Sequence, residues 1–162
     1  MERTFVFAAL PQNAAELRAL PEFALSDPFM TAALTVAALC RYEADPNAAV
    51  DMLNELRGPR PLSNFEIQFL RDRLAGKGYK PFSYFNGAAP ANNYTPAKPY
   101  TITIRDDPYS YQNEGYARLQ LRSFGADNPR QVTLRRKGSQ WMLWEQMLLS
   151  DIRTPAKDDP WA

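Results

Sequence analysis

The sequence contains no histidine among its 162 residues. Histidine is the usual general base near neutral pH and the commonest metal ligand, so its absence excludes Ser-His and Cys-His nucleophilic arrangements. The single cysteine, Cys40, excludes an intramolecular disulfide and a thiolate metal cluster. No group of acidic residues has the spacing of a metal-binding motif. We therefore expect neither a metal site nor a cofactor.

The chain also lacks an excess of either charge, because 19 lysines and arginines oppose 18 acidic residues and leave a net charge of +1. This balance gives no general attraction to nucleic acid or to a membrane surface. Long apolar runs are absent from the start of the chain, where the run before Pro11 is too short for a signal-peptide core or a membrane span. We expect a cytoplasmic protein without membrane contact. Residues 3–8 can alternatively form a short strand at a sheet edge.

Four helices are predicted in the part of the chain from about residue 13 to 76. Asp27-Pro28 and Asp45-Pro46 each place a capping carboxylate before a proline at the first helical position, which is typical of a helix start. The second helix is apolar on nearly every side, so we expect it to be central and to bury its cysteine. The predicted helices cover about residues 13–20, 28–42, 46–57 and 63–75.

From Tyr100 onward, apolar residues alternate with polar ones, which indicates strands. Gly138-Ser139 is predicted to be a two-residue hairpin turn, with glycine at the positive φ of a type II′ turn. The turn sets a register with Leu134 opposite Leu143. The predicted strands cover about residues 100–105, 116–124, 130–137 and 140–149, and the last three form an antiparallel meander.

The hairpin register assigns one face of the two strands to the core and the other to solvent. On the solvent face Arg135 and Trp144 are diagonal neighbours, close enough for a cation–π contact. The predicted core face carries Val132, Leu134, Trp141, Leu143 and Met147. The predicted solvent face carries Thr133, Arg135, Lys137, Met142 and Trp144.

Two proline-containing segments are expected to lack regular structure. The loop at residues 79–99 has four prolines and five aromatic residues, so we expect an ordered loop that packs over the core. The tail at residues 150–162 is polar and interrupted by proline, and its Trp161 is predicted to pack back onto the domain.

These segments predict a single α+β domain spanning residues 1–162, with a block of about four helices packed on a β-meander at residues 100–149. The order of LPQN, TAALTVAALCRYEADPNAAVDMLN, PLSNFEIQFLRDRL, GKGYKPFSYFNGAAPANNYTP and QWMLWEQMLLSDIR resembles a family of uncharacterised bacterial proteins, a domain of unknown function found chiefly in Gram-positive anaerobes. That resemblance implies no activity or ligand. VTLRRKGSQWMLWE is similar to the closing hairpin of NTF2-like, cone-shaped domains, which is the alternative fold.

Three classes of function remain open from the sequence. A non-enzymatic binding or accessory domain, acting on a protein or on a small anionic or planar ligand, fits a chain without reactive groups. A nucleic-acid-binding protein that uses an arginine and aromatic sheet face is one alternative. The other is an enzyme that works without histidine through Glu145, which the register places on the core side opposite Val132 as a partly buried carboxylate.

The predicted binding surface is the solvent face of the meander with its adjoining loops. Arginine forks and flat aromatic rings suit an anionic or planar ligand, or the acidic surface of a partner protein. The alternative is a solvated face whose arginines prevent edge-to-edge aggregation. The sequence specifies neither the partner nor the oligomeric state. The predicted site residues are Arg118, Arg122, Arg135 and Trp144, with Tyr84, Tyr94, Tyr109 and Tyr111 on the loops.

Overall fold

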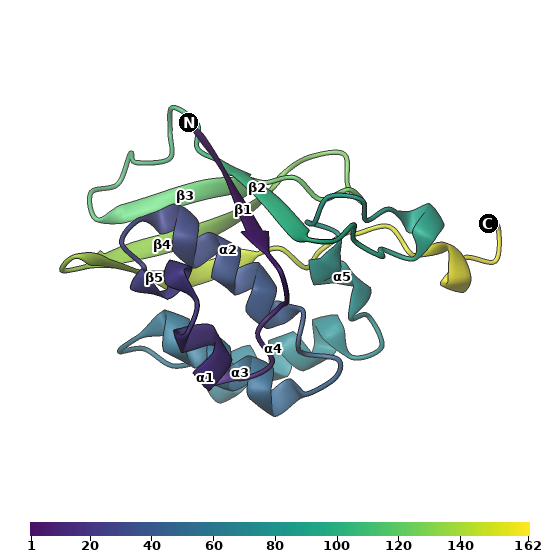
Figure 1. Cartoon of the computed structure of the whole chain (residues 1–162), viewed down its shortest axis with the longest axis horizontal. Coiled ribbons are helices and arrows are strands. Elements are labelled where there is room, and N and C mark those ends of the chain that lie inside the picture. Colours follow the sequence, from purple (N-terminus) through teal and green to yellow (C-terminus); the bar gives the residue numbers. More distant parts are fainter.

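The computed structural model describes residues 1–162, with helices covering one face of a five-stranded antiparallel sheet (Figure 1). The strands are β1 (Glu2–Phe7), β2 (Tyr100–Arg105), β3 (Tyr116–Leu121), β4 (Arg130–Lys137) and β5 (Gln140–Met147). The helices are α1 (Ala14–Arg18), α2 (Pro28–Leu39), α3 (Pro46–Arg57), α4 (Asn64–Leu74) and α5 (Tyr79–Phe82), with 3-10 turns η1 (Pro21–Ala24), η2 (Pro90–Asn92) and η3 (Ala156–Asp158). The predicted α+β class is confirmed.

The five strands lie side by side in chain order, and each neighbouring pair is antiparallel. The helical segment is inserted between β1 and β2, which pair with Phe5 opposite Ile102, and both of these side chains are buried. The N-terminal residues thus form an edge strand. β2 and β3 pair only at Ile104–Leu121 and Arg105–Gln120. The sheet therefore opens between these two strands.

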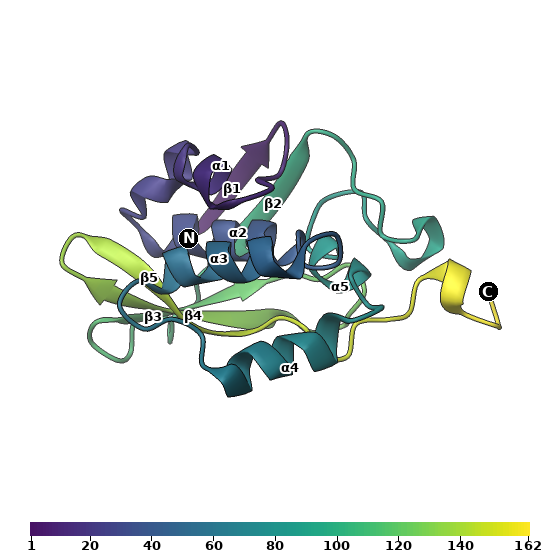
Figure 2. The same cartoon turned by 90° about the horizontal axis from the view of Figure 1, so that it is seen from below.

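Helix α2 lies between the sheet and α3 and contacts both (Figure 2). All of its residues are buried except Met30, as expected of a helix that is apolar on nearly every side. The two buried threonines are satisfied, because the Thr31 hydroxyl donates to the Trp141 carbonyl oxygen at 2.6 Å and the Thr35 hydroxyl donates to the Thr31 carbonyl oxygen at 2.8 Å. Although α2 is this apolar, no helix of the protein has the length and apolarity needed to cross a membrane.

The β4–β5 hairpin has the predicted register from its turn to the pair Leu134–Leu143. Beyond that pair a β-bulge shifts the ladder, so that Thr133 lies opposite Glu145 and Trp144 is the extra residue. One extra residue moves the side chain of every later residue in the strand to the opposite face of the sheet.

Two predictions about β5 are wrong because of this bulge. Glu145 was expected opposite Val132 on the core side, but Gln146 takes that position and Glu145 is exposed. Met147 was also expected in the core and is 61% exposed.

β5 is an edge strand whose free side is covered by groups from the helical segment. The Trp141 N–H donates to the Leu25 carbonyl oxygen at 2.8 Å, and the Arg57 guanidinium donates to the Trp144 carbonyl oxygen at 3.2 Å. Because these bonds occupy backbone groups of the edge, they also make β5 a poor template for pairing with another chain.

The proline-containing segments depart from the prediction in two places. Tyr79–Phe82 forms the single turn of α5, since the N–H that Pro81 lacks would be unpaired in a first turn anyway. Trp161 is 93% exposed, so the prediction that it packs back is wrong. The last residues extend away from the sheet (Figure 1). Tyr84, Phe85 and Tyr94 are buried, as expected for an ordered aromatic loop.

We expect Leu143→Ala to lower the free energy of unfolding by about 2–5 kcal/mol, because it opens a cavity in the core. Leu143 is only 4% exposed. Met147→Ala is the matched control in the same strand, and its cost should stay within about 0.5 kcal/mol. Urea denaturation followed by circular dichroism measures both. Equal losses would mean that the bulge does not exchange the faces of β5.

Candidate functional site

The face of the sheet opposite the helices is here called the outer face (Figure 1), and the predicted site was expected on it. Strand pairing places Arg118 beside Thr133, and Tyr116 beside Arg135. Arg118 and Arg135 are both exposed, and neither has a carboxylate within ion-pair distance. The outer face therefore offers guanidinium groups that no acidic side chain neutralises.

A groove of about 340 Å³ crosses the outer face above Arg118 and is called the Arg118 groove below. One wall is the loop between β2 and β3, which contributes Tyr109 and Asn113. The opposite wall is β5, which contributes Trp144 and Glu145. The Arg118 N–H donates to the Ser110 carbonyl oxygen at 2.9 Å, so the loop is held along the edge of β3 where β2 has ended.

The Trp144 side chain, at the bulge, packs against two arginine guanidinium groups and one tyrosine ring. The guanidinium carbon of Arg135 lies 4.7 Å from the centre of its ring, which agrees with the predicted cation–π contact. The guanidinium carbon of Arg60 lies 4.4 Å from the same ring, and the Tyr116 ring packs edge-to-face at 5.7 Å. Because Trp144 is already covered by its own neighbours, its ring forms a wall of the groove more readily than a platform for a flat ligand.

Arg60 and Tyr116 were both missed from the sequence. Tyr116 precedes Arg118 by two residues on the same strand, so the period of β3 is a signal that could have identified it. Arg60 reaches the outer face around the edge of the sheet, because the loop after α3 is tied down by Arg57. The Arg57 guanidinium donates to the Arg60 carbonyl oxygen at 2.9 Å and pairs with Glu66 at 3.0 Å.

Arg57 is the buried cation of this region, with its side chain 4% exposed. Burial lowers its pKa, an effect that the nearby Glu66 carboxylate opposes. A buried guanidinium with bonds to two carbonyl oxygens and one carboxylate is a structural clamp. We therefore assign Arg57 no part in ligand binding.

A second hollow, of about 1040 Å³, lies where β2 and β3 separate. It is lined by Arg122, whose guanidinium lies over the Phe124 ring with its carbon 4.8 Å from the ring centre. Tyr84 lies at its floor and is only 2% exposed, with its hydroxyl donating to the Leu148 carbonyl oxygen. The predicted grouping of Arg122 with Arg118 at one site is thus not found, because the two arginines line different hollows.

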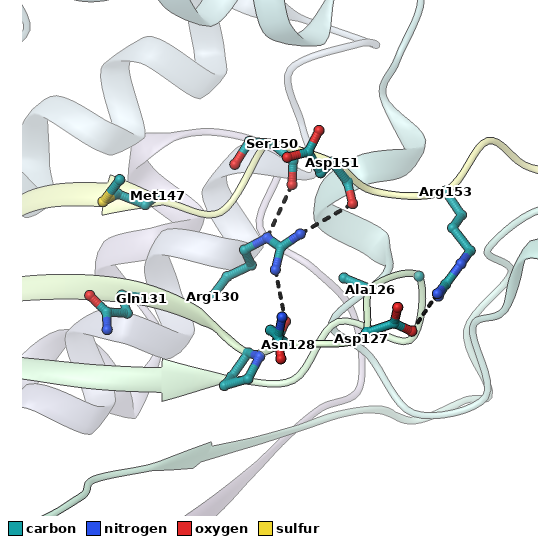
Figure 3. Close-up of a pocket in the computed structure, with 11 residues that line it drawn as sticks. Ala126, Asp127, Asn128, Arg130, Gln131, Met147, Ser150, Asp151 and Arg153 are labelled. Carbon is teal, nitrogen blue, oxygen red and sulfur yellow. Dashed lines mark hydrogen bonds and ion pairs between the residues drawn. The ribbon is translucent and has the colours of Figure 1, made fainter.

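The chain after β5 forms a strap that ties the loop at residues 125–130 to the rest of the domain (Figure 3). Arg130 donates to the carbonyl oxygens of Asn128, Ser150 and Asp151 at 2.8, 3.0 and 3.1 Å. Arg153 pairs with Asp127. An open pocket of about 560 Å³ lies beside these bonds. Its two arginines, Arg130 and Arg153, already make the structural contacts just described.

Tyr94 packs against this strap and is not part of a binding surface. Its hydroxyl donates to the Arg153 carbonyl oxygen at 2.6 Å, and its ring stacks on Tyr79 at 5.4 Å between centres. Tyr94 is 2% exposed, so the prediction that it borders the outer face is wrong. The aromatic pattern of the segment correctly indicated packing, and packing leaves the ring unavailable to a partner.

Tyr111 lies on the loop between β2 and β3 but bonds away from the Arg118 groove. Its hydroxyl donates to the Asp106 carboxylate at 3.2 Å. Burial and the Asp106 charge raise the pKa of Tyr111 to about 12. Of the four predicted loop tyrosines, Tyr109 alone lines this groove.

The chemistry available at the outer face is recognition by charge and hydrogen bonds. Glu145, the residue for which an enzymatic role was predicted, is exposed on the groove wall and is not the partly buried carboxylate of that prediction. No three acidic or cysteine side chains gather closely enough to hold a metal ion.

Comparison with known families gives one assignment for nearly the whole chain. Residues 9–156 match the model of a family described as Domain of unknown function (DUF6935). This match confirms the resemblance to an uncharacterised family. No curated protein and no solved structure matches the chain.

We expect the stability of the protein to fall between about pH 10 and pH 12, partly because of Tyr94. Burial and the neighbouring Tyr79 raise the pKa of Tyr94 to about 12 in the folded state. A tyrosine in the unfolded chain has a pKa of about 10. In this interval the unfolded chain has lost a proton that the folded chain keeps, so rising pH favours unfolding. Tyr94→Phe should make the decline shallower in urea denaturation at successive pH values. Identical slopes for the two proteins would refute this assignment.

Proposed function

The chain belongs to the DUF6935 family, and we propose that it is a non-enzymatic binding domain whose Arg118 groove takes a carboxylate-bearing ligand. The ligand is a small anion or an acidic side chain of a partner protein. One observation carries the proposal: an arginine without an ion-pair partner lies on the floor of a walled groove. A guanidinium fork recognises a carboxylate through two parallel hydrogen bonds.

Neighbouring side chains support this assignment by adding uncharged donors. The Thr133 hydroxyl and the amides of Gln131 and Asn113 line the same groove, and their side chains make no hydrogen bond within the protein. A few convergent polar groups beside aromatic walls are typical of sites that orient a small ligand. Together with Arg118 they provide donors for both oxygens of a carboxylate.

Glu145 limits the kind of anion that the groove accepts. It lies two strands away from Arg118, at a backbone distance of about 10 Å from standard strand spacing. A second negative charge on the ligand at that end would be repelled. We therefore propose a ligand that carries its carboxylate at the Arg118 end and a hydrogen-bond donor at the Glu145 end.

A flat ligand is not part of the proposal. Stacking would need a free face of Trp144, and the guanidinium groups of Arg60 and Arg135 lie over that ring. We propose a bacterial cytoplasm as the place where the protein acts, and the free, buried Cys40 is compatible with a reducing compartment.

Titration calorimetry with two probes tests the proposal: 4-hydroxybutyrate, which has one carboxylate and one hydroxyl donor, as the small anion, and a peptide with a single glutamate among serines as the acidic partner segment. Arg118→Ser should weaken binding of the effective probe at least tenfold, because a hydrogen bond to a charged group contributes about 1.5–3 kcal/mol. Binding of 4-hydroxybutyrate alone would identify a small anion, and binding of the peptide alone would identify a partner protein.

Two further variants distinguish binding at the Arg118 groove from nonspecific electrostatic attraction to the protein. Arg136→Ser removes the same charge from the neighbouring strand β4; Arg136 does not line the groove, so this variant should leave affinity unchanged. Glu145→Gln should strengthen 4-hydroxybutyrate binding about twofold, since unit charges ~10 Å apart in water repel by about 0.4 kcal/mol. If neither probe binds, or if Arg136→Ser weakens binding as much as Arg118→Ser does, the proposed site is wrong.

A further inference from the structure

A narrow apolar groove lies between α4 and β5, on the opposite side of the β5 edge from the Arg118 groove. Figure 2 shows α4 at the margin of the helical layer, beside the end of β5. The groove has a volume of about 200 Å³. Its floor consists of four leucines of the core, Leu39, Leu53, Leu70 and Leu143.

Two phenylalanines of α4 flank this groove and are left in solvent. Phe65 is 80% exposed and Phe69 is 39% exposed. They are four residues apart and therefore lie on one face of the helix. Burying a phenylalanine side chain is favourable, and exposed apolar surface next to an apolar hollow is typical of an interaction site.

We propose that this surface joins two copies of the chain in a two-fold dimer, in which Phe65 of each copy enters the α4–β5 groove of the other. The groove is smaller than the roughly 300–1,000 Å³ of sites for small molecules, and it suits a single aromatic side chain. A protruding ring beside a hollow on the same patch is self-complementary. Self-complementarity is the requirement of an interface in which both copies use the same surface.

The charges at the two ends of the groove are also complementary under this symmetry. Glu145 lies on the β5 wall and has no ion-pair partner. It lies near the first turn of α4, because Arg57 binds both the Trp144 carbonyl oxygen and Glu66. Arg73 lies seven residues after Glu66, about 10 Å further along the helix, and has no carboxylate partner either.

A two-fold axis that lies in the plane of the interface and crosses the middle of the groove exchanges the two ends of the groove. Glu145 of each copy then faces Arg73 of its partner. Arg73 already lies over the Phe69 ring, with its guanidinium carbon 4.9 Å from the ring centre, so its charge is held at this surface. The apolar contacts and the ion pairs thus favour the same orientation.

Sedimentation velocity of the full chain, from about 1 µM to about 1 mM, tests the dimer because it covers the affinities expected of modest interfaces. The wild type should pass from monomer to dimer within this range. Phe65→Ser should raise the dissociation constant at least tenfold. Val6→Ser, which removes an apolar side chain that is 56% exposed on β1, is the matched control and should change nothing.

A charge exchange tests the orientation. Glu145→Arg and Arg73→Glu should each weaken the dimer several-fold, and the double variant should restore it, because the two residues meet only between copies. Circular dichroism verifies that each variant is folded. A wild type that stays monomeric throughout, a dimer that tolerates Phe65→Ser, or a double variant without restored association would overturn the proposal.

Discussion

A helix with almost no polar surface has to be enclosed on all sides, and α2 imposes this requirement on the rest of the fold. A single layer cannot cover a cylinder, so the sheet covers one side of α2 and α3 covers the other. The only hydroxyls on α2 that need partners bond to its own backbone and to β5. The sheet meets this demand with one face, and its outer face is left without a helical layer over it.

Arginine has two different roles in this molecule, and the difference lies in its partners. Arg57 and Arg130 each donate to two or more backbone carbonyl oxygens and hold loops against strands. Arg118 has no such partner and lies in a groove. The sequence alone does not distinguish these roles, because the carbonyl oxygens that satisfy Arg57 and Arg130 include ones that are distant in the chain.

Local signals in the sequence predicted the elements well, whereas long-range contacts decided the site. Asp27, Asp45 and Ser63 cap helices as predicted, because capping depends on residues three positions away. Tyr84 and Tyr94 were correctly predicted to be ordered, but as partners of the distant Leu148 and Arg153 they are closed to ligands. Their burial depends on the path of the C-terminal strap, which no local pattern specifies.

The bulge in β5 has a consequence for how such a surface can arise in evolution. With Trp144 taken out of the chain, Leu143 would still oppose Leu134 and Glu145 would still oppose Thr133, with every side chain on its present face. The large ring is therefore an addition to an otherwise regular ladder, and the core does not depend on it. A lineage could gain or lose this wall of the groove through the insertion or deletion of one codon, while the pairing that holds the sheet together is inherited unchanged.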